Sequence, residues 1–301
     1  MTISAPKPPW LRKKIPSGGH KPEILETIKE GALHTVCAEA KCPNQMECFS
    51  KGTATFLLLG PNCTRNCRFC AVGKHPVHPP DPEEPLRVAR AVARMGVAFC
   101  VLTMVTRDDL PDGGADHIAR SIDTIRQECP GVGIEVLISD LAGDRTALRT
   151  VLEAGPEVLN HNIETVPRLY PAVRPQADYK RSIDLLAASN ALAPEMITKS
   201  GIMLGLGETR DEVLQVMDDL IGAGCRLLTL GQYLAPSDKH HPVIRYVTPE
   251  EFEDYQIAAE ERGFSGVASS PFVRSSYRAG SLYQNALKSI SRRILKGKTT
   301  P

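Results

Sequence analysis

Residues 53–70 read TATFLLLGPNCTRNCRFC, an apolar run that leads into a loop with three cysteines. The run 53–59 is almost continuously apolar and rich in Thr and Leu, as expected of a strand buried on both faces. In parallel α/β proteins the loops at the carboxyl ends of the strands carry the chemistry. The stretch therefore predicts a parallel sheet with a cysteine site at its functional edge.

Five further runs of this kind follow, and helical patterns alternate with them. The expected strands are 53–59, 97–104, 132–139, 157–163, 196–204 and 225–232. The expected helices are 84–95, 115–128, 144–153, 179–190, 210–223 and 249–262, the last with Thr248 as its cap and Glu251 three residues later. Six consecutive β-α units predict a parallel sheet, either doubly wound or curved into a complete or partial barrel.

Two extensions flank this α/β region, which covers residues 53–265. Residues 1–52 contain three more cysteines, and we expect them to pack on the barrel. Residues 266–301 are expected to end in a basic, frayed tail from Arg292 to Pro301.

The composition indicates a globular protein without an unusual partner. Hydrophobic residues make up 42% and charged residues 24% of the 301 residues, which excludes a disordered chain. The net charge of +1 gives no general attraction to nucleic acid or to a membrane surface. No apolar run is long enough to span a bilayer, and the first residues lack the apolar stretch of a secretory signal. We therefore expect a monomeric, cytoplasmic protein that binds neither nucleic acid nor membrane.

The nine cysteines are too few and too unevenly placed for a disulfide scaffold. Six of them fall within 34 residues, in two groups. We call Cys63, Cys67 and Cys70 the loop triplet, and Cys37, Cys42 and Cys48 the arm triplet. In a reducing compartment such groups favour metal ligation over disulfides.

The spacing of the loop triplet lets a single loop wrap one iron–sulfur cluster. Three thiolates leave one iron of a four-iron cubane open, and an open position is what a metal site needs to bind and activate a substrate. A zinc ribbon would need a second Cys-x-x-Cys hook, and a bacterial ferredoxin run would need a fourth cysteine followed by proline. A zinc-stabilised binding protein stays open as an alternative. Metal analysis separates it, because two cubanes require about eight irons per chain.

The loop triplet, with Phe69 before its last cysteine, resembles the motif of the radical S-adenosylmethionine superfamily. The resemblance implies that the open iron chelates the methionine part of S-adenosylmethionine, whose cleavage yields a 5′-deoxyadenosyl radical that abstracts hydrogen from an unactivated carbon. Cofactor contacts are then expected at the strand ends. These candidates are Phe69, Asn162, Glu164, Arg174, Gly205, Glu208, Gln232 and Tyr233.

The arm triplet and one further motif narrow the resemblance to the lipoyl synthases. The arm triplet resembles the auxiliary-cluster motif of that family, and residues 274–277 resemble its Arg-Ser-Ser-Tyr motif. The resemblance implies that Ser276 is the fourth ligand of the auxiliary cluster. Its oxygen is a harder ligand than a thiolate, so it suits a site that must give up sulfide. The implied fold is a partial (βα)6 barrel with N- and C-terminal extensions.

The same resemblance implies the reaction and the partners. Two sulfur atoms enter a protein-bound octanoyl-lysine to give a lipoyl group, with one S-adenosylmethionine used for each hydrogen abstraction and with sulfur taken from the auxiliary cluster. The implied cofactors are two 4Fe-4S clusters and S-adenosylmethionine. The implied partners are an octanoylated lipoyl carrier domain or glycine cleavage H protein, a ferredoxin or flavodoxin, and an iron–sulfur carrier. A different two-cluster radical enzyme is the alternative, and product analysis separates the two.

Overall fold

The computed structural model describes residues 6–13, 16 and 18–297, with side chains described as far as Ser291. Its seven strands form one parallel sheet in the order β1-β2-β3-β4-β5-β6-β7. The strands are β1 Thr55–Leu58, β2 Phe99–Met104, β3 Gly133–Leu137, β4 Val158–Asn160, β5 Ile197–Leu204, β6 Leu227–Gln232 and β7 Gly266–Ser269.

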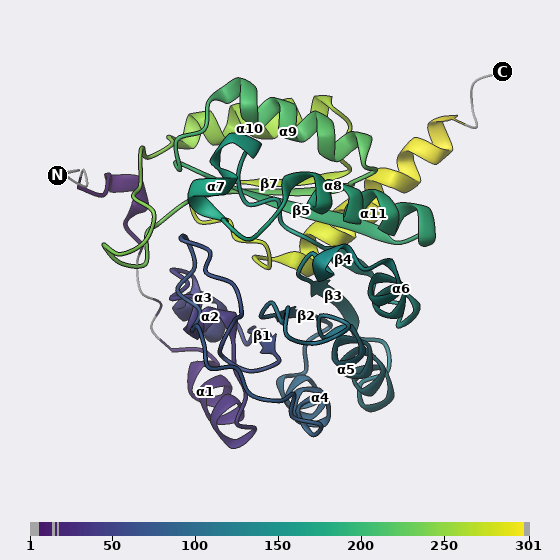
Figure 1. Cartoon of the computed structure of the whole chain (residues 1–301). Coiled ribbons are helices and arrows are strands. Elements are labelled where there is room, and N and C mark those ends of the chain that lie inside the picture. Colours follow the sequence, from purple (N-terminus) through teal and green to yellow (C-terminus); the bar gives the residue numbers. More distant parts are fainter. Residues whose placement is uncertain (1–5, 14–15, 17, 298–301) are drawn as a thin grey trace.

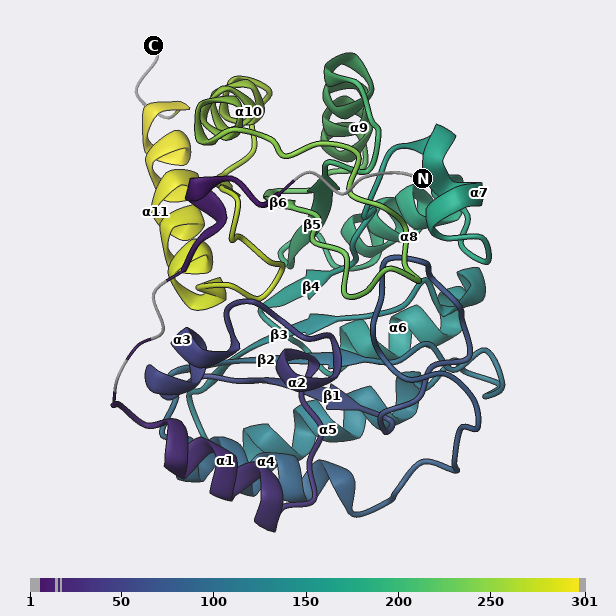
Figure 2. The same ribbon diagram turned by 90° about the vertical axis from the view of Figure 1, so that its left-hand side faces the viewer.

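The consecutive strand order decides between the two predicted architectures. A doubly wound sheet reverses its order at a switch point, whereas here each strand pairs with the next one along the chain. Right-handed crossovers then place every connecting helix on the same, outer face, as Figures 1 and 2 show. β1 and β7 end the described sheet without pairing with each other, so the fold is an unclosed barrel. The predicted partial barrel is confirmed, with a seventh strand that the sequence did not suggest.

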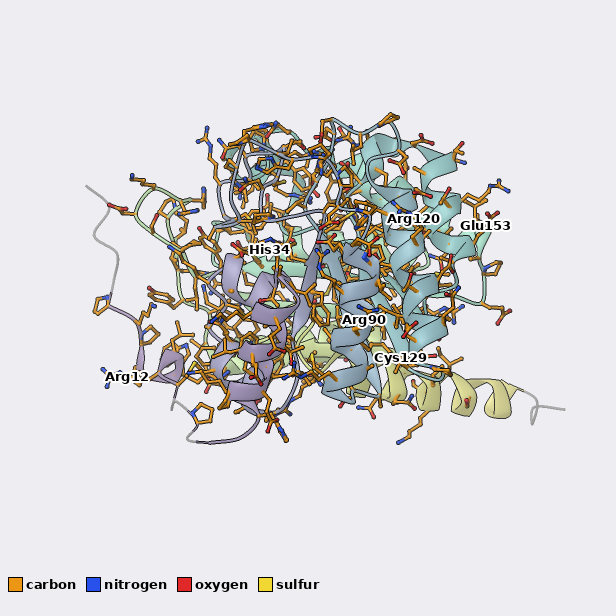
Figure 3. The ribbon with its side chains drawn as sticks, turned by 90° about the horizontal axis from the view of Figure 1, so that it is seen from below. Arg12, His34, Arg90, Arg120, Cys129 and Glu153 are labelled. Carbon is orange, nitrogen blue, oxygen red and sulfur yellow. The ribbon has the colours of Figure 1, made fainter. Side chains whose placement is uncertain are left out.

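The helices between the strands lie close to where the sequence predicts them. They are α4 Glu84–Met95, α5 Ala115–Glu128, α6 Arg145–Glu153, α8 Tyr179–Leu192, α9 Arg210–Gly222 and α10 Pro249–Glu261. The short helix α7 Tyr170–Val173 and the 3-10 turns at Pro9–Leu11, Leu141–Gly143 and Pro167–Leu169 were not predicted. Thr248 caps α10 in the predicted capping box with Glu251. The outer faces of α4 and α5 are charged: Arg90 and Arg120 are exposed and lie on the outside of the molecule (Figure 3).

A last helix, α11 Ala279–Gly297, packs against the amino ends of the strands. Its Leu282 and Ala286 join Val158, Ile197 and Leu227 in a buried apolar cluster there. Val158, Ile197 and Leu227 are the first residues of β4, β5 and β6. α11 therefore closes this end of the barrel and forms its floor. The predicted frayed tail is therefore wrong up to Gly297, because the helix continues that far; residues 298–301 lie outside the described residues.

The residues before β1 form an arm of three short helices, α1 Lys21–Glu30, α2 Val36–Glu39 and α3 Gln45–Ser50. The arm pairs with the free edge of β1, where the Leu57 N–H donates to the His34 carbonyl at 2.9 Å. α1 lies along α4 (Figure 2), where Arg94 forms ion pairs with Glu26 and Glu30.

The arm also spans the open side of the barrel. The Asn44 side chain donates to the Phe272 carbonyl at 2.6 Å, and the Tyr277 hydroxyl donates to Glu47 at 3.0 Å. These contacts join the arm to residues 271–278, which we call the motif segment. No helix in the described part of the chain combines the length and the apolarity that crossing a bilayer requires.

Candidate active site

The loop triplet lies on the loop that leaves the carboxyl end of β1. The Cys63 N–H donates to the Gly73 carbonyl at 2.8 Å, so the two ends of the loop are tied together. The Cys70 N–H donates to the Cys67 carbonyl at 3.2 Å and closes a tight turn between those two cysteines. The loop thus holds its three thiols in a fixed arrangement at the functional edge of the sheet, as the sequence predicts.

Arg65, inside the loop triplet, fastens this loop to the rest of the barrel. Its buried guanidinium forms paired contacts with Asp108, at 2.7 and 2.8 Å, and with Asp140, at 3.0 and 2.7 Å. Arg181 also binds Asp140, at 2.8 Å. Such two-pronged Arg–carboxylate contacts fix orientation as well as position. Arg65 could not be predicted from the sequence, because neither carboxylate is close to it along the chain.

Burial, with a smaller contribution from the thiols of Cys67 and Cys63, raises the pKa of the Cys70 thiol to about 11. Burial also raises the pKa of Cys67, although the positive charge of Arg174 opposes that shift. These two thiols are therefore protonated at neutral pH in the metal-free chain. Because iron binds thiolates, cluster assembly must release protons.

The arm triplet spans α2 and α3. Cys37 lies buried in α2, where the Thr35 hydroxyl accepts a hydrogen bond from the Ala38 N–H as the helix cap. Cys42 follows α2, with its N–H donating to the Cys37 carbonyl at 3.0 Å, and Cys48 lies in α3. Burial, with the neighbouring Cys42 and Cys48 thiols, raises the pKa of Cys37 to about 12.

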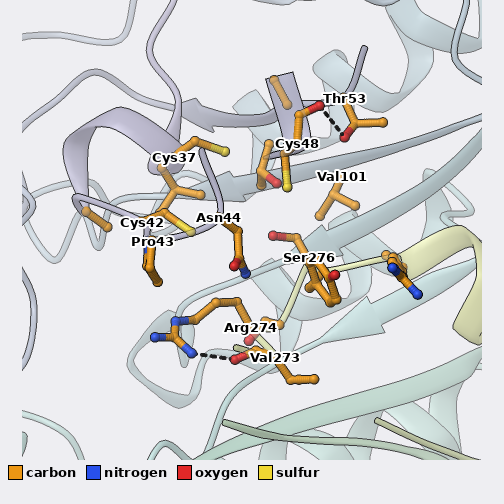
Figure 4. A pocket seen from close by; sticks show the side chains of 18 of the residues that line it. Cys37, Cys42, Pro43, Asn44, Cys48, Thr53, Val101, Val273, Arg274 and Ser276 are labelled. Carbon is orange, nitrogen blue, oxygen red and sulfur yellow. Dashed lines mark hydrogen bonds between the residues drawn. The ribbon is translucent and has the colours of Figure 1, made fainter. Parts of the chain in front are cut away.

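The motif segment carries Ser276 to the same place. Figure 4 shows Ser276 and Arg274 beside the arm triplet, within one cavity. The Arg274 guanidinium donates to the Val273 carbonyl, and its charge acts on both Cys42 and Glu164. The charge of Arg274 therefore acts both on the arm triplet and on the residues that follow β4.

This cavity has a volume of about 1150 Å³ and extends from the arm triplet to Cys70, the one member of the loop triplet that lines it. The arm triplet, Ser276, Phe69 and Cys70 all line it, although residues 37–48 and 276 are far apart in sequence. Within the described residues no three His, Cys, Asp or Glu side chains converge on a site for one metal ion. The cysteines that line the cavity are instead the arm triplet and Cys70, and soft thiolates are the ligands of iron–sulfur clusters.

Three of the predicted cofactor contacts gather after β4. Asn162 donates to the Glu164 carboxylate at 3.0 Å, and both side chains line the cavity. Glu164 has a left-handed backbone with φ of 67°, and burial raises the pKa of its carboxyl although Arg174 and Asn162 oppose the shift. Strained residues of this kind cluster at ligand sites.

Two polar atoms here are buried without a partner among the described residues: Asn162 Oδ1 and Arg174 Nε. The remaining contacts of Arg174 go to the carbonyls of Asn162 and Ile163 and to the Tyr170 hydroxyl. Buried polar atoms normally have partners, so these two have unused capacity beside the loop triplet. The arrangement fits a polar ligand such as the amino acid part of S-adenosylmethionine.

The other predicted contacts divide into two pairs. Gln232 and Tyr233 line the cavity at the end of β6. Gly205 and Glu208 do not line it; the Glu208 carboxylate accepts the N–H groups of Gly205 and Leu206, at 2.6 and 2.9 Å, and so braces the turn after β5. Gly205 has φ of 97°, and an added Cβ would lie 2.3 Å from the Gln232 amide. The absence of a side chain at Gly205 therefore leaves room for the Gln232 side chain.

The loop after β6 covers the loop triplet. The His240 ring lies 3.2 Å from the Cys70 carbonyl through Nε2, and the His241 N–H donates to the Arg68 carbonyl at 2.8 Å. The Tyr233 hydroxyl in turn donates to the His241 carbonyl at 2.6 Å. The two histidines therefore fix the cover by contacts with backbone groups.

Comparison with known proteins agrees with this geometry. A sequence model of the Radical SAM superfamily matches residues 57–220, which is more than half of the chain. A lipoyl synthase of Desulfotalea psychrophila is 52% identical over 280 residues, covering 93% of this chain and 94% of the relative. One from Caldanaerobacter subterraneus subsp. tengcongensis is 54% identical over 273 residues, covering 91% and 95%.

Among solved structures, HydG, a maturase of the [FeFe]-hydrogenase, has the same fold. Its TM-score is 0.54 at 17% identity, over 82% of this chain and 62% of the HydG chain. Superfamily membership implies one 4Fe-4S cluster and S-adenosylmethionine as cofactors. With relatives more than half identical over nearly its whole length, the chain belongs to the lipoyl synthase family of the radical S-adenosylmethionine superfamily.

Proposed function

We propose that this chain inserts two sulfur atoms into a protein-bound octanoyl-lysine, and that its two cysteine triplets hold two different clusters for that purpose. One observation carries the proposal: the arm triplet, Ser276 and Cys70 of the loop triplet line a single cavity of about 1150 Å³. A hydrogen-abstracting group and a sulfur donor must both reach the same acyl chain, and a shared cavity meets that requirement.

The loop triplet would bind a 4Fe-4S cluster and leave one iron open. The arm triplet with Ser276 would bind an auxiliary 4Fe-4S cluster with four protein ligands. When bound, the first cluster with S-adenosylmethionine supplies the hydrogen-abstracting radical and the auxiliary cluster supplies sulfur. Three thiolates and one hydroxyl make an uneven ligand set, because the hard oxygen is the weakest match to iron in a sulfur-rich site.

The remaining site residues would bind and orient S-adenosylmethionine. Arg174 Nε and Asn162 Oδ1, which have no partner among the described residues, would meet a carboxylate and an ammonium group, and the Glu164 carboxyl lies beside Asn162. Gln232 and Tyr233 border the cavity at the end of β6, where we place the adenine ring with Phe69 opposite. Gly205 and Glu208 would act by shaping the turn that supports Gln232.

Exclusion of water is the other task of this site, since reactive intermediates must be kept from side reactions. The arm closes the open side of the barrel, α11 closes its floor and the loop after β6 covers the loop triplet. An octanoyl-lysine arm must still enter. We propose that it is presented by an octanoylated lipoyl carrier domain or glycine cleavage H protein, that a ferredoxin or flavodoxin supplies electrons, and that an iron–sulfur carrier rebuilds the auxiliary cluster.

The test uses mass spectrometry of an octanoyl-lysine peptide incubated with the anaerobic, reduced protein and S-adenosylmethionine. We expect a product with two added sulfur atoms. The variant with Cys37, Cys42 and Cys48 all changed to Ala should still cleave S-adenosylmethionine but should add no sulfur. If this variant still makes lipoyl product, the arm triplet is not the sulfur site.

The chain provides a matched control for that variant. Cys100, Cys129 and Cys225 are three buried cysteines outside both triplets. Changing these three to Ala should preserve both S-adenosylmethionine cleavage and sulfur insertion. A loss of sulfur insertion in the control would mean that the effect of the first variant is not specific to the arm triplet.

A further inference from the structure

A buried ion pair lies inside the barrel below the cavity and takes no part in the proposed chemistry. Glu135 on β3 and Lys199 on β5 are both fully buried, and the Lys199 Nζ lies 2.8 and 2.9 Å from the two carboxylate oxygens. Asn160, on the strand between them, donates to the same carboxylate at 3.0 Å. Removing two charges from water is expensive, and apolar residues of similar volume usually stabilise a core equally well. Stability alone therefore does not explain why this ion pair lies in the core.

The third contact of the Lys199 ammonium group indicates what the ion pair does. Lys199 Nζ donates to the carbonyl of Ser275 at 2.6 Å. With two contacts to Glu135 and one to Ser275, all three of its N–H donors are used. Among the described residues, the one group outside the sheet that Lys199 Nζ binds is thus the backbone carbonyl of Ser275, the residue before Ser276.

The surrounding residues hold Ser275 at the same place. Its hydroxyl receives a hydrogen bond from the Asn162 amide at 2.6 Å. An added Cβ on Gly201 would lie 3.1 Å from that hydroxyl, and one on Gly231 would lie 2.1 Å from the Val273 carbonyl. The inner face of the sheet therefore leaves room for the motif segment.

Ser276 consequently lies between two anchored neighbours. Ser275 is fixed to the inside of the barrel through Lys199, and Tyr277 is fixed to the arm through Glu47. Ser276 itself makes no side-chain hydrogen bond among the contacts described, and it lines the cavity beside the arm triplet. Its position is set by the backbone on either side of it.

We propose that Lys199, held by Glu135, is a positioning residue that sets how far Ser276 reaches toward the arm triplet. The ion pair links β3 to β5, and Lys199 acts on the proposed auxiliary site through the backbone carbonyl of Ser275. This inference rests on the proposed role of the arm triplet and Ser276 as cluster ligands, but the anchoring of the motif segment can be tested without any cluster.

The test replaces the pair by neutral residues of similar size, E135Q with K199M, so that no unpaired charge is left in the core. Hydrogen exchange of the metal-free protein measures the anchor directly. We expect amides in the motif segment to exchange about 10- to 100-fold faster, the effect of losing one hydrogen bond to a charged group, while β2 keeps its protection. In the reconstituted protein, a chelator should remove auxiliary-cluster iron faster, while S-adenosylmethionine cleavage is retained.

The matched control is Tyr179→Phe, which removes a hydrogen bond of 2.6 Å to Asp219 between the outer helices α8 and α9. It should change neither the exchange of the motif segment nor the retention of auxiliary iron. Unchanged exchange of the motif segment in E135Q with K199M would overturn the proposal. If that variant does not fold, E135Q with K199Q serves instead, since the shorter glutamine cannot reach the Ser275 carbonyl.

The two proposals fail in different ways. If the unmodified chain assembles only one cluster, the auxiliary site of the proposed function is wrong, whereas the exchange result still decides the anchor. If both clusters assemble and auxiliary iron is retained equally in E135Q with K199M, Lys199 does not position Ser276 for the auxiliary site, and the proposed function stands.

Discussion

Gly231 lies on β6 where the motif segment enters the barrel, and its lack of a side chain is a packing requirement. An added Cβ would lie 2.1 Å from the Val273 carbonyl oxygen, a backbone atom that cannot move alone. We expect Gly231→Ala to lower the free energy of unfolding by about 1–3 kcal/mol through overpacking. Urea denaturation of the metal-free protein measures this change.

Gly222, at the end of α9, is the control for that substitution. A Cβ there meets no atom within 4 Å, and Gly222 has no left-handed backbone. Gly222→Ala should leave stability unchanged or raise it by up to about 1 kcal/mol, because Ala favours helix. Equal effects of the two substitutions would contradict the packing account of Gly231.

His161 gives the stability a defined pH dependence. Burial, then the nearby positive charge of Arg174, lowers the pKa of His161 to about 4 from 6.5. Between pH 6.5 and 4 the unfolded chain therefore binds a proton that the folded chain does not, so the free energy of unfolding falls over this range. The stability that depends on neutral His161 is complete above pH 6.5 and is lost as the pH falls through 4. Between pH 7 and 5 the loss is about 2 kcal/mol.

The measurement compares urea midpoints at pH 7 and pH 5 for the wild type and for His161→Gln. The neutral side chain should remove most of the drop that the wild type shows. His78→Gln changes an exposed histidine and should keep the wild-type drop. A wild-type drop that persists in His161→Gln would assign the pH dependence to other groups.

At the scale of elements, α11 decides whether the barrel has a floor. Leu282 is 7% exposed and packs on the starts of β4, β5 and β6, whereas Leu25 on α1 is 45% exposed. Leu282→Ala should destabilise the protein by about 2–5 kcal/mol, because it leaves a cavity in a closed cluster. Leu25→Ala should stay within about 0.5 kcal/mol. Thermal unfolding of the two variants measures the difference, and similar values would mean that α11 is only loosely attached.

The helices and strands of the barrel were predictable because each carries its own pattern. Six buried apolar runs and six amphipathic stretches appear in the structure within a few residues of their expected bounds. β7 was not predictable, since Gly266–Ser269 is a short stretch that is only half-buried and becomes a strand through its pairing with β6. α11 did leave a signal, because Leu282, Ala286 and Ile290 recur every four residues. The basic residues of the tail obscured it.

The site was predictable where its signal is local in the sequence. Each triplet lies within one short stretch, so the six cysteines and their likeness in spacing to known motifs could be found without a structure. Arg65 could not be found in that way, because its partners Asp108 and Asp140 lie 43 and 75 residues further along the chain. Lys199 and Glu135 were hidden for the same reason, 64 residues apart on non-adjacent strands.

At the scale of the whole molecule, the arm and the motif segment together close the barrel. We call the contact between the arm and the motif segment the seam. Among the described residues two hydrogen bonds form it, from Asn44 to the Phe272 carbonyl and from Tyr277 to Glu47. The ammonium group of Lys13 adds a contact over the Phe272 ring, 4.9 Å from its centroid. The seam also brings the arm triplet to Ser276, so the proposed auxiliary site exists only while the barrel is closed.

Loosening the seam should therefore open the arm without unfolding the barrel. We expect Asn44→Ala with Tyr277→Phe to speed hydrogen exchange of α2 and α3 amides in the metal-free protein by about tenfold or more, since both hydrogen bonds of the seam are lost, together with the one that Asn44 accepts from Lys13. Amides of α4 to α6 should keep their protection. Thr150→Ala with Ser291→Ala removes two exposed side-chain hydrogen bonds elsewhere and should leave the arm unchanged.

If the arm keeps its full protection in the seam variant, its pairing with β1 and its own core around Phe49 hold it in place. The closure would then belong to the arm itself, and the motif segment would merely rest against it.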